Sequence, residues 1–168
     1  RRTAVDMSIA ELGRRAGVSA AFISQVEAGR SSMSIPTLYR VASALGCSAN
    51  ALLGASESRP HVTRAGSGMT LPASSGKRTQ LTRLLSRTGD DARLESFHYV
   101  IAPGDDELEW FCHGGEDFVY VIAGSIAIEF DDGAVVELGS GDSLHHAGAV
   151  GHRWVLRGEM TAEVLCVV

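Results

Sequence analysis

The sequence predicts a multidomain protein in which an all-α domain is followed by an all-β sandwich or barrel. Apolar residues recur at helical spacing up to Gly54 and at every second position from about residue 79. Charge divides in a similar way, because residues 1–59 carry seven arginines against four acidic residues while the rest of the chain is acidic. A length of 168 residues accommodates two small domains. We expect domains at residues 1–54 and 76–168, joined by a linker and edge strand at residues 55–75.

Residues that start and stop helices divide the first domain. Ser8 and Glu11 form a capping box that predicts a helix over residues 9–16. Ser19 can cap a second helix over residues 20–28. Two further helices are expected over residues 35–45 and 49–53. The first domain is therefore a set of short helices joined by tight turns.

The second of these helices has an outward face that suits a DNA major groove. Phe22, Ile23 and Val26 share one face, and small or amide side chains occupy the other. A helix with such a face, held by a tight turn behind another helix, is typical of groove-reading domains. Any small helical hairpin can show the same spacing, so spacing alone leaves both interpretations open.

Three segments in this domain carry a more specific signal: Ala10–Ser19, Phe22–Gly29, and Pro36–Leu38 with Ala44–Gly46. In this order and spacing they resemble the helix-turn-helix of XRE-type, phage-repressor-like regulators. That family has a further helix before the capping box, of which Arg1–Val5 supplies only the last turn. Either the chain begins inside a longer product, or the domain is less stable than its relatives.

The resemblance implies double-stranded operator DNA as a partner, bound by a homodimer at two half-sites about 34 Å apart. By position, the family's base-reading residues correspond to Ala20, Ala21 and Gln25, and its phosphate contacts to Ser19, Ser24 and Arg30. Gln25 can pair with the N6 and N7 atoms of adenine, whereas the alanines offer only methyl contacts. Ser24 and Arg30 could equally be solvated surface residues.

The acidic part of the chain predicts an antiparallel β-domain. Short apolar or alternating runs are separated by turn residues, with a first edge strand expected near Pro60–Arg64. The other expected strands lie at residues 80–86, 93–101, 117–122, 125–130, 134–138 and 161–168. This spacing is typical of a sandwich or barrel.

Cysteine usage and hydropathy indicate a cytoplasmic protein that does not bind membranes. Cys47, Cys112 and Cys166 are few, far apart and odd in number, so no disulfide framework is implied. No apolar run approaches the roughly 20 residues that a membrane span needs. No signal-peptide pattern opens the chain.

Two segments of the β-domain, His113–Gly124 and Gly141–His152, resemble the two motifs of the cupin superfamily of small jelly-roll barrels. The resemblance is to the sensor half found behind XRE domains, and it implies a small-molecule effector. In the family, two histidines spaced H-x-H, a glutamate four residues on and a histidine of the second motif hold a metal. Phe111 stands at the first of these positions, so the resemblance leaves His113, Asp117 and His152 as ligands.

Those three residues form the two-histidine, one-carboxylate set that suits a divalent ion such as iron, zinc, nickel or manganese. The alternative is that the metal is lost and these side chains line a pocket for an organic ligand, so no cofactor is certain. Strand alternation places further residues inside. The expected pocket residues are His98, Phe111, His113, Asp117, Val119, Val121, His152 and Trp154. His145 and His146 fall outside the ligand positions and are not counted as ligands.

Together the two resemblances predict a DNA-binding transcriptional regulator whose barrel binds an effector, and not an enzyme. The alternative is a non-haem metal oxidase, because some proteins that join these two domains are epoxidases acting on phosphonates. A third interpretation is an inert barrel that only dimerises. Metal content and oxygen consumption distinguish the oxidase from the other two.

Overall fold

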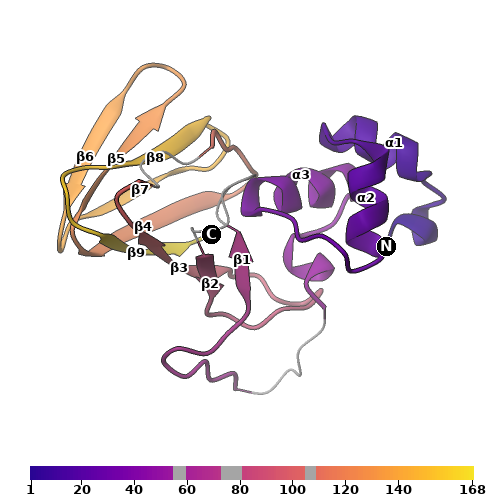
Figure 1. Ribbon diagram of the computed structural model, residues 1–168, viewed down its shortest axis with the longest axis horizontal. Coiled ribbons are helices and arrows are strands. Elements are labelled where there is room, and N and C mark those ends of the chain that lie inside the picture. The colour runs from indigo at the N-terminus through magenta and orange to yellow at the C-terminus, as the bar shows by residue number, and fades with distance from the viewer. Residues whose placement is uncertain (55–59, 73–80, 105–108) are drawn as a thin grey trace.

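The computed structural model describes residues 1–54, 60–72, 81–104 and 109–168. It contains a helical domain and a β-domain side by side (Figure 1). Residues 55–59 and 73–75 of the expected linker, and residues 76–80 at the start of the expected β-domain, lie outside the described residues. No helix in the described part of the chain is long and apolar enough to cross a membrane.

The helical domain begins where the capping residues predict it. Its elements are η1 (Arg2–Val5), α1 (Ile9–Ala16), α2 (Ala20–Glu27), α3 (Ile35–Leu45) and η2 (Asn50–Leu52). The side chains of Ser8, Ser19 and Ser34 each accept a hydrogen bond from the backbone N–H three residues on. The three predicted α-helices are confirmed, whereas the expected helix over residues 49–53 is a short 3₁₀ turn, η2.

A small apolar cluster holds α1, α2 and α3 together. It consists of Leu12, Ala16, Ile23 and Val41, all nearly inaccessible to solvent. Gly13 lets α1 and α2 approach closely, since a Cβ atom there would lie 2.8 Å from the Val18 carbonyl oxygen. The packed helix pair leaves the opposite face of α2 in solvent.

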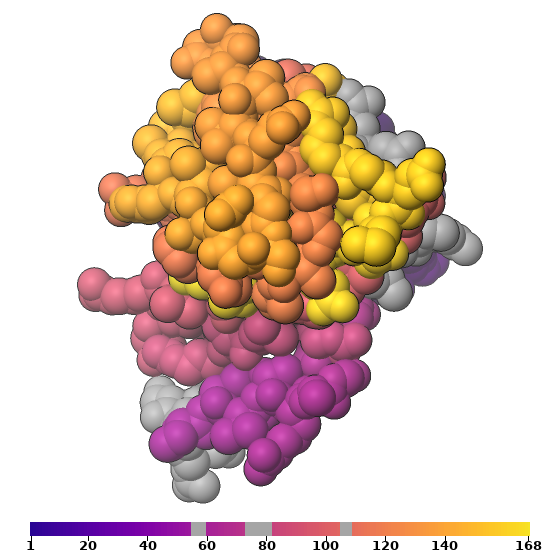
Figure 2. Space-filling view, turned by 90° about the vertical axis from the view of Figure 1, so that its left-hand side faces the viewer, coloured from indigo at the N-terminus to yellow at the C-terminus, as the bar shows by residue number. Residues whose placement is uncertain are grey.

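The β-domain consists of two antiparallel sheets. Its strands are β1 (Thr70–Pro72), β2 (Leu81–Leu84), β3 (Ser96–Ile101), β4 (Glu116–Ala123), β5 (Ser125–Phe130), β6 (Val135–Gly139), β7 (Ser143–Ala147), β8 (His152–Leu156) and β9 (Ala162–Val167). The order is β1-β2-β3-β9-β4-β7 in the larger sheet and β6-β5-β8 in the smaller. Figure 2 shows this domain from the side of β5 and β6, with the helical domain mostly behind it.

The six strands expected after residue 79 are confirmed, but the first edge strand is misplaced. Residues 60–64 have no regular structure, and the edge strand of the larger sheet is β1, which pairs with β2. β7 and β8 were not among the listed strands, and the sequence of β7, SLHHA, shows no alternation of apolar residues. Pairing with β4 makes it extended.

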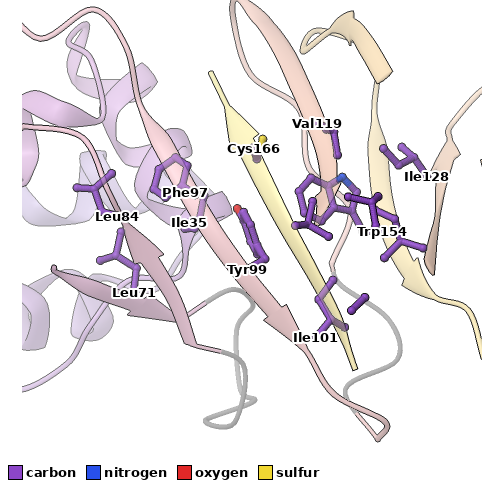
Figure 3. Close-up of a cluster of buried hydrophobic side chains, with 14 of the residues drawn as sticks. Ile35, Leu71, Leu84, Phe97, Tyr99, Ile101, Val119, Ile128, Trp154 and Cys166 are labelled. Carbon is purple, nitrogen blue, oxygen red and sulfur yellow. The ribbon is translucent and has the colours of Figure 1, made fainter. Parts of the chain in front are cut away.

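The two sheets enclose an apolar core between their inner faces (Figure 3). On β4 the residues alternate as expected: Val119 and Val121 are fully buried, whereas Phe118 and Tyr120 are 43% and 38% exposed. On β8, Trp154 points into the same core. The period-two pattern therefore predicted correctly which side of each of these strands is internal.

Helix α3 belongs to both domains. Its Ile35, Leu38 and Ala42 lie in the same buried cluster as the core of the β-domain, while Val41 lies in the core of the helical domain. Figure 1 shows α3 extending from the helical domain to the edge of the barrel. The two domains are therefore joined by a continuous apolar contact.

A buried carboxylate adds a polar link at this junction. Glu95, which precedes β3 and is 7% exposed, accepts a hydrogen bond from the Tyr39 hydroxyl of α3 and another, at 3.1 Å, from the backbone N–H of Asn50. Burial, and secondly the charge of Glu95, raises the pKa of Tyr39 far above its ordinary value, so the hydroxyl remains a donor. One glutamate thus holds both α3 and η2 against the β-domain.

Candidate functional site

Two imidazoles of the β-domain lie close to one carboxylate oxygen. The Oδ2 atom of Asp117, on β4, lies 2.9 Å from His113 Nε2 and 3.5 Å from His152 Nε2. All three side chains are at least 95% buried. The cupin resemblance predicted this set of residues, and the structure brings one ligand atom of each to within 4.8 Å of the others.

Backbone carbonyl groups orient both imidazoles. The Nδ1 atom of His113 lies 2.9 Å from the Gly114 oxygen, and Nδ1 of His152 lies 2.8 Å from the Val150 oxygen. Because a carbonyl oxygen can only accept, each Nδ1 carries the hydrogen and Nε2 faces Asp117. Metal-binding histidines are held by such outer hydrogen bonds.

The two imidazoles differ in their affinity for a proton. Burial lowers the pKa of His113, but the hydrogen bond and charge of Asp117 outweigh it, so the pKa lies above the ordinary histidine value. At His152 burial dominates and lowers the pKa. His113 is therefore the partner that shares a proton with Asp117.

The donor set fits a divalent transition-metal ion. Two ligand atoms that each lie about 2.1 Å from one ion are about 3 to 4.2 Å apart, depending on the angle between them. The measured separations from Asp117 Oδ2 fall at or within this range. Aspartate is one methylene shorter than the glutamate of the cupin pattern, yet Oδ2 of Asp117 lies 2.9 Å from His113 Nε2. The Cys166 thiol lies 3.7 Å from its other oxygen, Oδ1.

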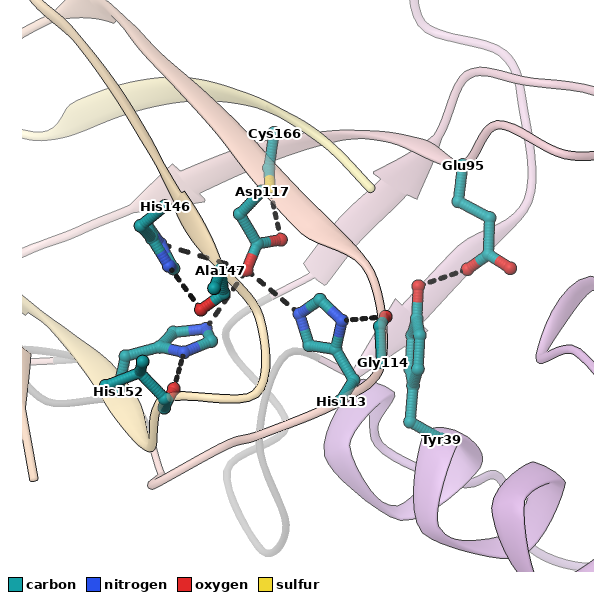
Figure 4. A network of polar contacts seen from close by, with 10 residues as sticks. Tyr39, Glu95, His113, Gly114, Asp117, His146, Ala147, His152 and Cys166 are labelled. Carbon is teal, nitrogen blue, oxygen red and sulfur yellow. Dashed lines mark hydrogen bonds and ion pairs between the residues drawn. The ribbon is translucent and has the colours of Figure 1, made fainter.

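Phe111 occupies the family's first histidine position and cannot coordinate. Its backbone forms a β-bridge with His152, and its ring lies 4.7 Å from that of His113. The Tyr39 ring, from α3, packs 5.2 Å from Phe111 and 5.1 Å from His113. Figure 4 shows Tyr39 of α3 beside His113. Helix α3 therefore contacts the side chains that surround the site.

A cavity of about 40 Å³ adjoins the site and has walls from both domains. Ile35, Pro36 and Tyr39 of α3 form one wall. The β-domain supplies the rest: Phe97, Tyr99, Glu109, Phe111, Asp117, His152, Arg153, Trp154, Cys166 and Val168. A much larger open groove between the domains is also lined by Tyr39 and reaches His113.

The structure places the expected pocket residues in different surroundings. Phe111, Asp117, His152 and Trp154 line the cavity, and His113 lies beside it in the groove. Val119 and Val121 point inward but lie in solid core away from the cavity.

His98 was wrongly assigned to the pocket. On β3 it is Phe97 and Tyr99 that point inward, and His98 lies on the outer face, 3.3 Å from Glu163. The large apolar residues Phe97, Tyr99 and Ile101 share one parity of β3, so strand alternation itself places His98 on the opposite, outer face.

Sequence reasoning also missed the contribution of α3 to the cavity. Tyr39 and Pro36 carry no sequence signal for a ligand, because their spacing is that of an ordinary helix. Only the packing of the two domains places them over the β-domain.

Histidines 145 and 146, which were not counted as ligands, behave differently from each other. His145 is largely exposed and lies 3.4 Å from Glu116. The side chain of His146 is 9% exposed, and its Nε2 lies 3.8 Å from Asp117 Oδ2 (Figure 4). A third imidazole therefore approaches the same carboxylate.

The expected DNA-contacting residues lie together on and beside α2. Ala20, Ala21, Gln25 and Arg30 are exposed, and Ser24 is half-buried. Ser19 is also exposed, but its hydroxyl caps α2. This surface is not covered by the β-domain, since α3 makes the contacts with it (Figure 1).

Comparisons with known proteins agree with these two domains. Residues 1–52 match the family model of the HTH_3 helix-turn-helix, and residues 97–168 match that of the cupin domain. The chain therefore contains an HTH_3 helix-turn-helix domain followed by a cupin domain. No curated protein matches the sequence significantly.

Solved structures of similar fold include a regulator and an enzyme. An HTH_3 family transcriptional regulator from Vibrio cholerae is 22% identical with a TM-score of 0.69, over 99% of this chain and 89% of that one. Hydroxypropylphosphonic acid epoxidase from S. wedmorenis is 21% identical with a TM-score of 0.53, over 99% and 91%. At these identities the likeness concerns the fold.

Proposed function

We propose that the protein is a DNA-binding transcriptional regulator in which a ligand held in the cupin cavity changes the position of the helix-turn-helix domain. The two family matches support a DNA-binding regulator with a cupin domain. The observation that carries the coupling is the cavity wall formed by Ile35, Pro36 and Tyr39, which belong to the DNA-binding domain. A ligand there contacts both domains at once.

The size of the cavity indicates how coupling operates. About 40 Å³ holds a few water-sized groups, because one water needs roughly 10–15 Å³. A metabolite-sized effector therefore requires α3 to move away from the β-domain. Part of the ligand's binding free energy then drives a change in the arrangement of the two domains. This shifts the population toward one arrangement and so alters the affinity for the operator.

DNA is read by α2 in this proposal. Gln25 contacts a base edge, Ala20 and Ala21 offer methyl contacts, and Ser19, Ser24 and Arg30 lie near phosphates. Loss of a bidentate glutamine contact costs about 1–3 kcal/mol of discrimination. A phosphate contact adds affinity without specificity.

Selection from a random duplex library tests this proposal. We expect the full-length protein to enrich a roughly palindromic sequence. Gln25→Ala is expected to lower the protein's preference for that sequence, and Arg30→Ala is expected to lower the salt dependence of its DNA affinity. Glu137→Gln, on the exposed surface of β6, is the control and is expected to change neither property. Failure to enrich any sequence over mixed DNA contradicts the proposal.

A homodimer is required to read two half-sites. We place its contact on the outer face of the larger sheet, where Val100, Phe118, Tyr120 and Ile122 are 38–45% exposed. Light scattering is expected to give a dimer for the wild type and a monomer for Phe118→Lys, with weaker operator binding. A wild-type monomer contradicts this assignment. A regulator of this kind acts in the cytoplasm.

A divalent ion held by His113, Asp117 and His152 is the second part of the proposal. The buried, pre-oriented imidazoles and the ligand spacing support it. Iron, zinc, nickel and manganese all accept such ligands. Elemental analysis of protein purified without chelator is expected to find about one ion per chain, absent in His113→Ala.

The same metal centre supports a second candidate function, a non-haem metal oxidase. When bound, an iron ion would supply a site at which oxygen and a substrate meet. Arg153 is the one arginine or lysine among the described cavity residues, and it is 2.7 Å from Glu129. This pairing disfavours a clamp for a phosphonate. Substrate-dependent oxygen consumption by the iron-loaded protein would favour the oxidase over the regulator.

A further inference from the structure

We propose that His146 is a fourth metal ligand, so that the β-domain holds a divalent transition-metal ion with three imidazoles and one carboxylate. This inference rests on the metal centre proposed above and extends it. His146 lies on β7, outside the three positions that the cupin pattern leaves, and Phe111 removes the pattern's own fourth donor.

The first argument is the position of His146. Strand β7 pairs with β4 so that His146 stands opposite Asp117. Its Nε2 lies 3.8 Å from Asp117 Oδ2, inside the range of about 3 to 4.2 Å expected for two ligands of one ion. Its ring lies 4.7 Å from that of His152. His146 is not among the three residues whose ligand atoms all lie within 4.8 Å of one another, so its ring must move toward them to share an ion.

The second argument is an unsatisfied atom. Nε2 of His146 is buried and has no hydrogen-bond partner among the described residues. Leaving a buried polar atom unpaired costs about 1–3 kcal/mol. A metal ion at the centre of the cluster gives that nitrogen a partner and removes this cost.

The third argument is a shared orientation of the three rings. Nδ1 of His146 lies 3.2 Å from the Ala147 carbonyl oxygen, as Nδ1 of His113 and of His152 lie beside the oxygens of Gly114 and Val150. Each Nδ1 therefore carries the hydrogen, and three Nε2 atoms face Asp117 Oδ2. In this common orientation the three Nε2 atoms are directed toward one position, as ligands of a single ion are.

The composition of the donor set indicates the class of ion. Imidazole favours zinc, copper, iron and nickel, whereas magnesium and calcium prefer oxygen ligands. With three nitrogen donors and one carboxylate, the site is expected to bind Co²⁺ and Zn²⁺ but not Mg²⁺.

The test is titration of the metal-free full-length protein with Co²⁺, followed by its visible absorption. His146→Gln is compared with His145→Gln, a neighbouring histidine whose side chain is 61% exposed, and with His113→Ala. We expect His146→Gln to weaken Co²⁺ binding about tenfold or more and to change the spectrum, because a direct ligand matters at least as much as outer partners. His145→Gln is expected to match the wild type, and His113→Ala to lose the ion.

X-ray absorption of the zinc-loaded wild type counts the imidazoles directly and does not depend on any variant folding. Three imidazoles support the proposal, and two overturn it. If wild type binds Co²⁺ and His146→Gln binds it equally with the same spectrum, the role of His146 is refuted while the three-residue centre stands. If wild type binds no Co²⁺ or Zn²⁺, the metal centre itself fails.

Discussion

At the residue scale, the site depends on how closely its side chains pack. A Cβ atom on Gly148 would lie 2.3 Å from Cε1 of His113, whereas one on Gly114 would meet nothing within 4 Å. Neither glycine has a positive φ, so alanine is compatible with both backbones. The two positions therefore provide a matched pair of substitutions next to one ligand.

Gly148→Ala is expected to push the His113 ring out of the site and to weaken metal binding by about tenfold or more, a loss comparable to that of an outer partner. The protein still folds, because the ring can swing away at a cost of about 1–3 kcal/mol. Gly114→Ala is expected to bind as the wild type does. Calorimetric titration with Zn²⁺ measures the affinity of both variants. Equal affinities would show that an alanine at position 148 does not displace the His113 ring.

The hydroxyl of Tyr39 is the second residue-scale prediction. Tyr39→Phe removes the hydrogen bond to buried Glu95 and is expected to lower stability by about 1–3 kcal/mol. Tyr120→Phe, on the outer face of β4, is the control and is expected to change little. Chemical denaturation measures both. If Tyr39→Phe also abolishes the effect of an effector on DNA binding, Glu95 is part of the coupling between the cavity and the DNA-binding domain. A stability equal to that of Tyr120→Phe would contradict a stabilising hydrogen bond between Tyr39 and Glu95.

At the element scale, local sequence accounts for the helices but not for every strand. Ser8, Ser19 and Ser34 cap helices through hydrogen bonds only three residues away, so the signal is local. β7 has an extended shape because it pairs with β4, and its own sequence contains no alternating apolar pattern. This is why the three α-helices were predicted to within one residue of their ends, whereas β7 was missed.

The approach of α1 and α2 provides an element-scale prediction. An alanine Cβ at Gly13 would lie 2.8 Å from Val18 O and 3.2 Å from Ala20 N, and backbone atoms cannot swing away. Alanine favours a helix by about 1 kcal/mol, but overpacking costs about 1–3 kcal/mol. Gly13→Ala is therefore expected to lower the melting temperature and operator affinity. Ser43→Ala, at an exposed position of α3, is the control and is expected to lower neither quantity. A Gly13→Ala protein more stable than the wild type would contradict the close approach of α1 and α2.

At the scale of the whole molecule, the two domains share one apolar cluster through α3. Unfolding of either domain exposes residues that the other buries. We therefore expect a single thermal transition, although the sequence has the composition of two separate domains.

Leu38→Ala tests this shared core. The side chain is 1% exposed, and its removal is expected to cost about 2–5 kcal/mol. Far-ultraviolet circular dichroism reports the helices, and tryptophan fluorescence reports the β-domain through Trp110 and Trp154. Both signals are expected to shift together to lower temperature. A shift of the helical signal alone would show that the domains unfold independently.

The sequence by itself determined the two domain classes, the capped helices, the inward parity of β4 and β8, and the set His113, Asp117 and His152. These follow from local hydrogen bonds, side-chain alternation and short motifs. Only the tertiary structure decided that His146 approaches Asp117 and that α3 closes the cavity. Each of these depends on which strand pairs with which, or on how one domain packs on the other. Such contacts join residues far apart in the chain and leave no periodic pattern in it.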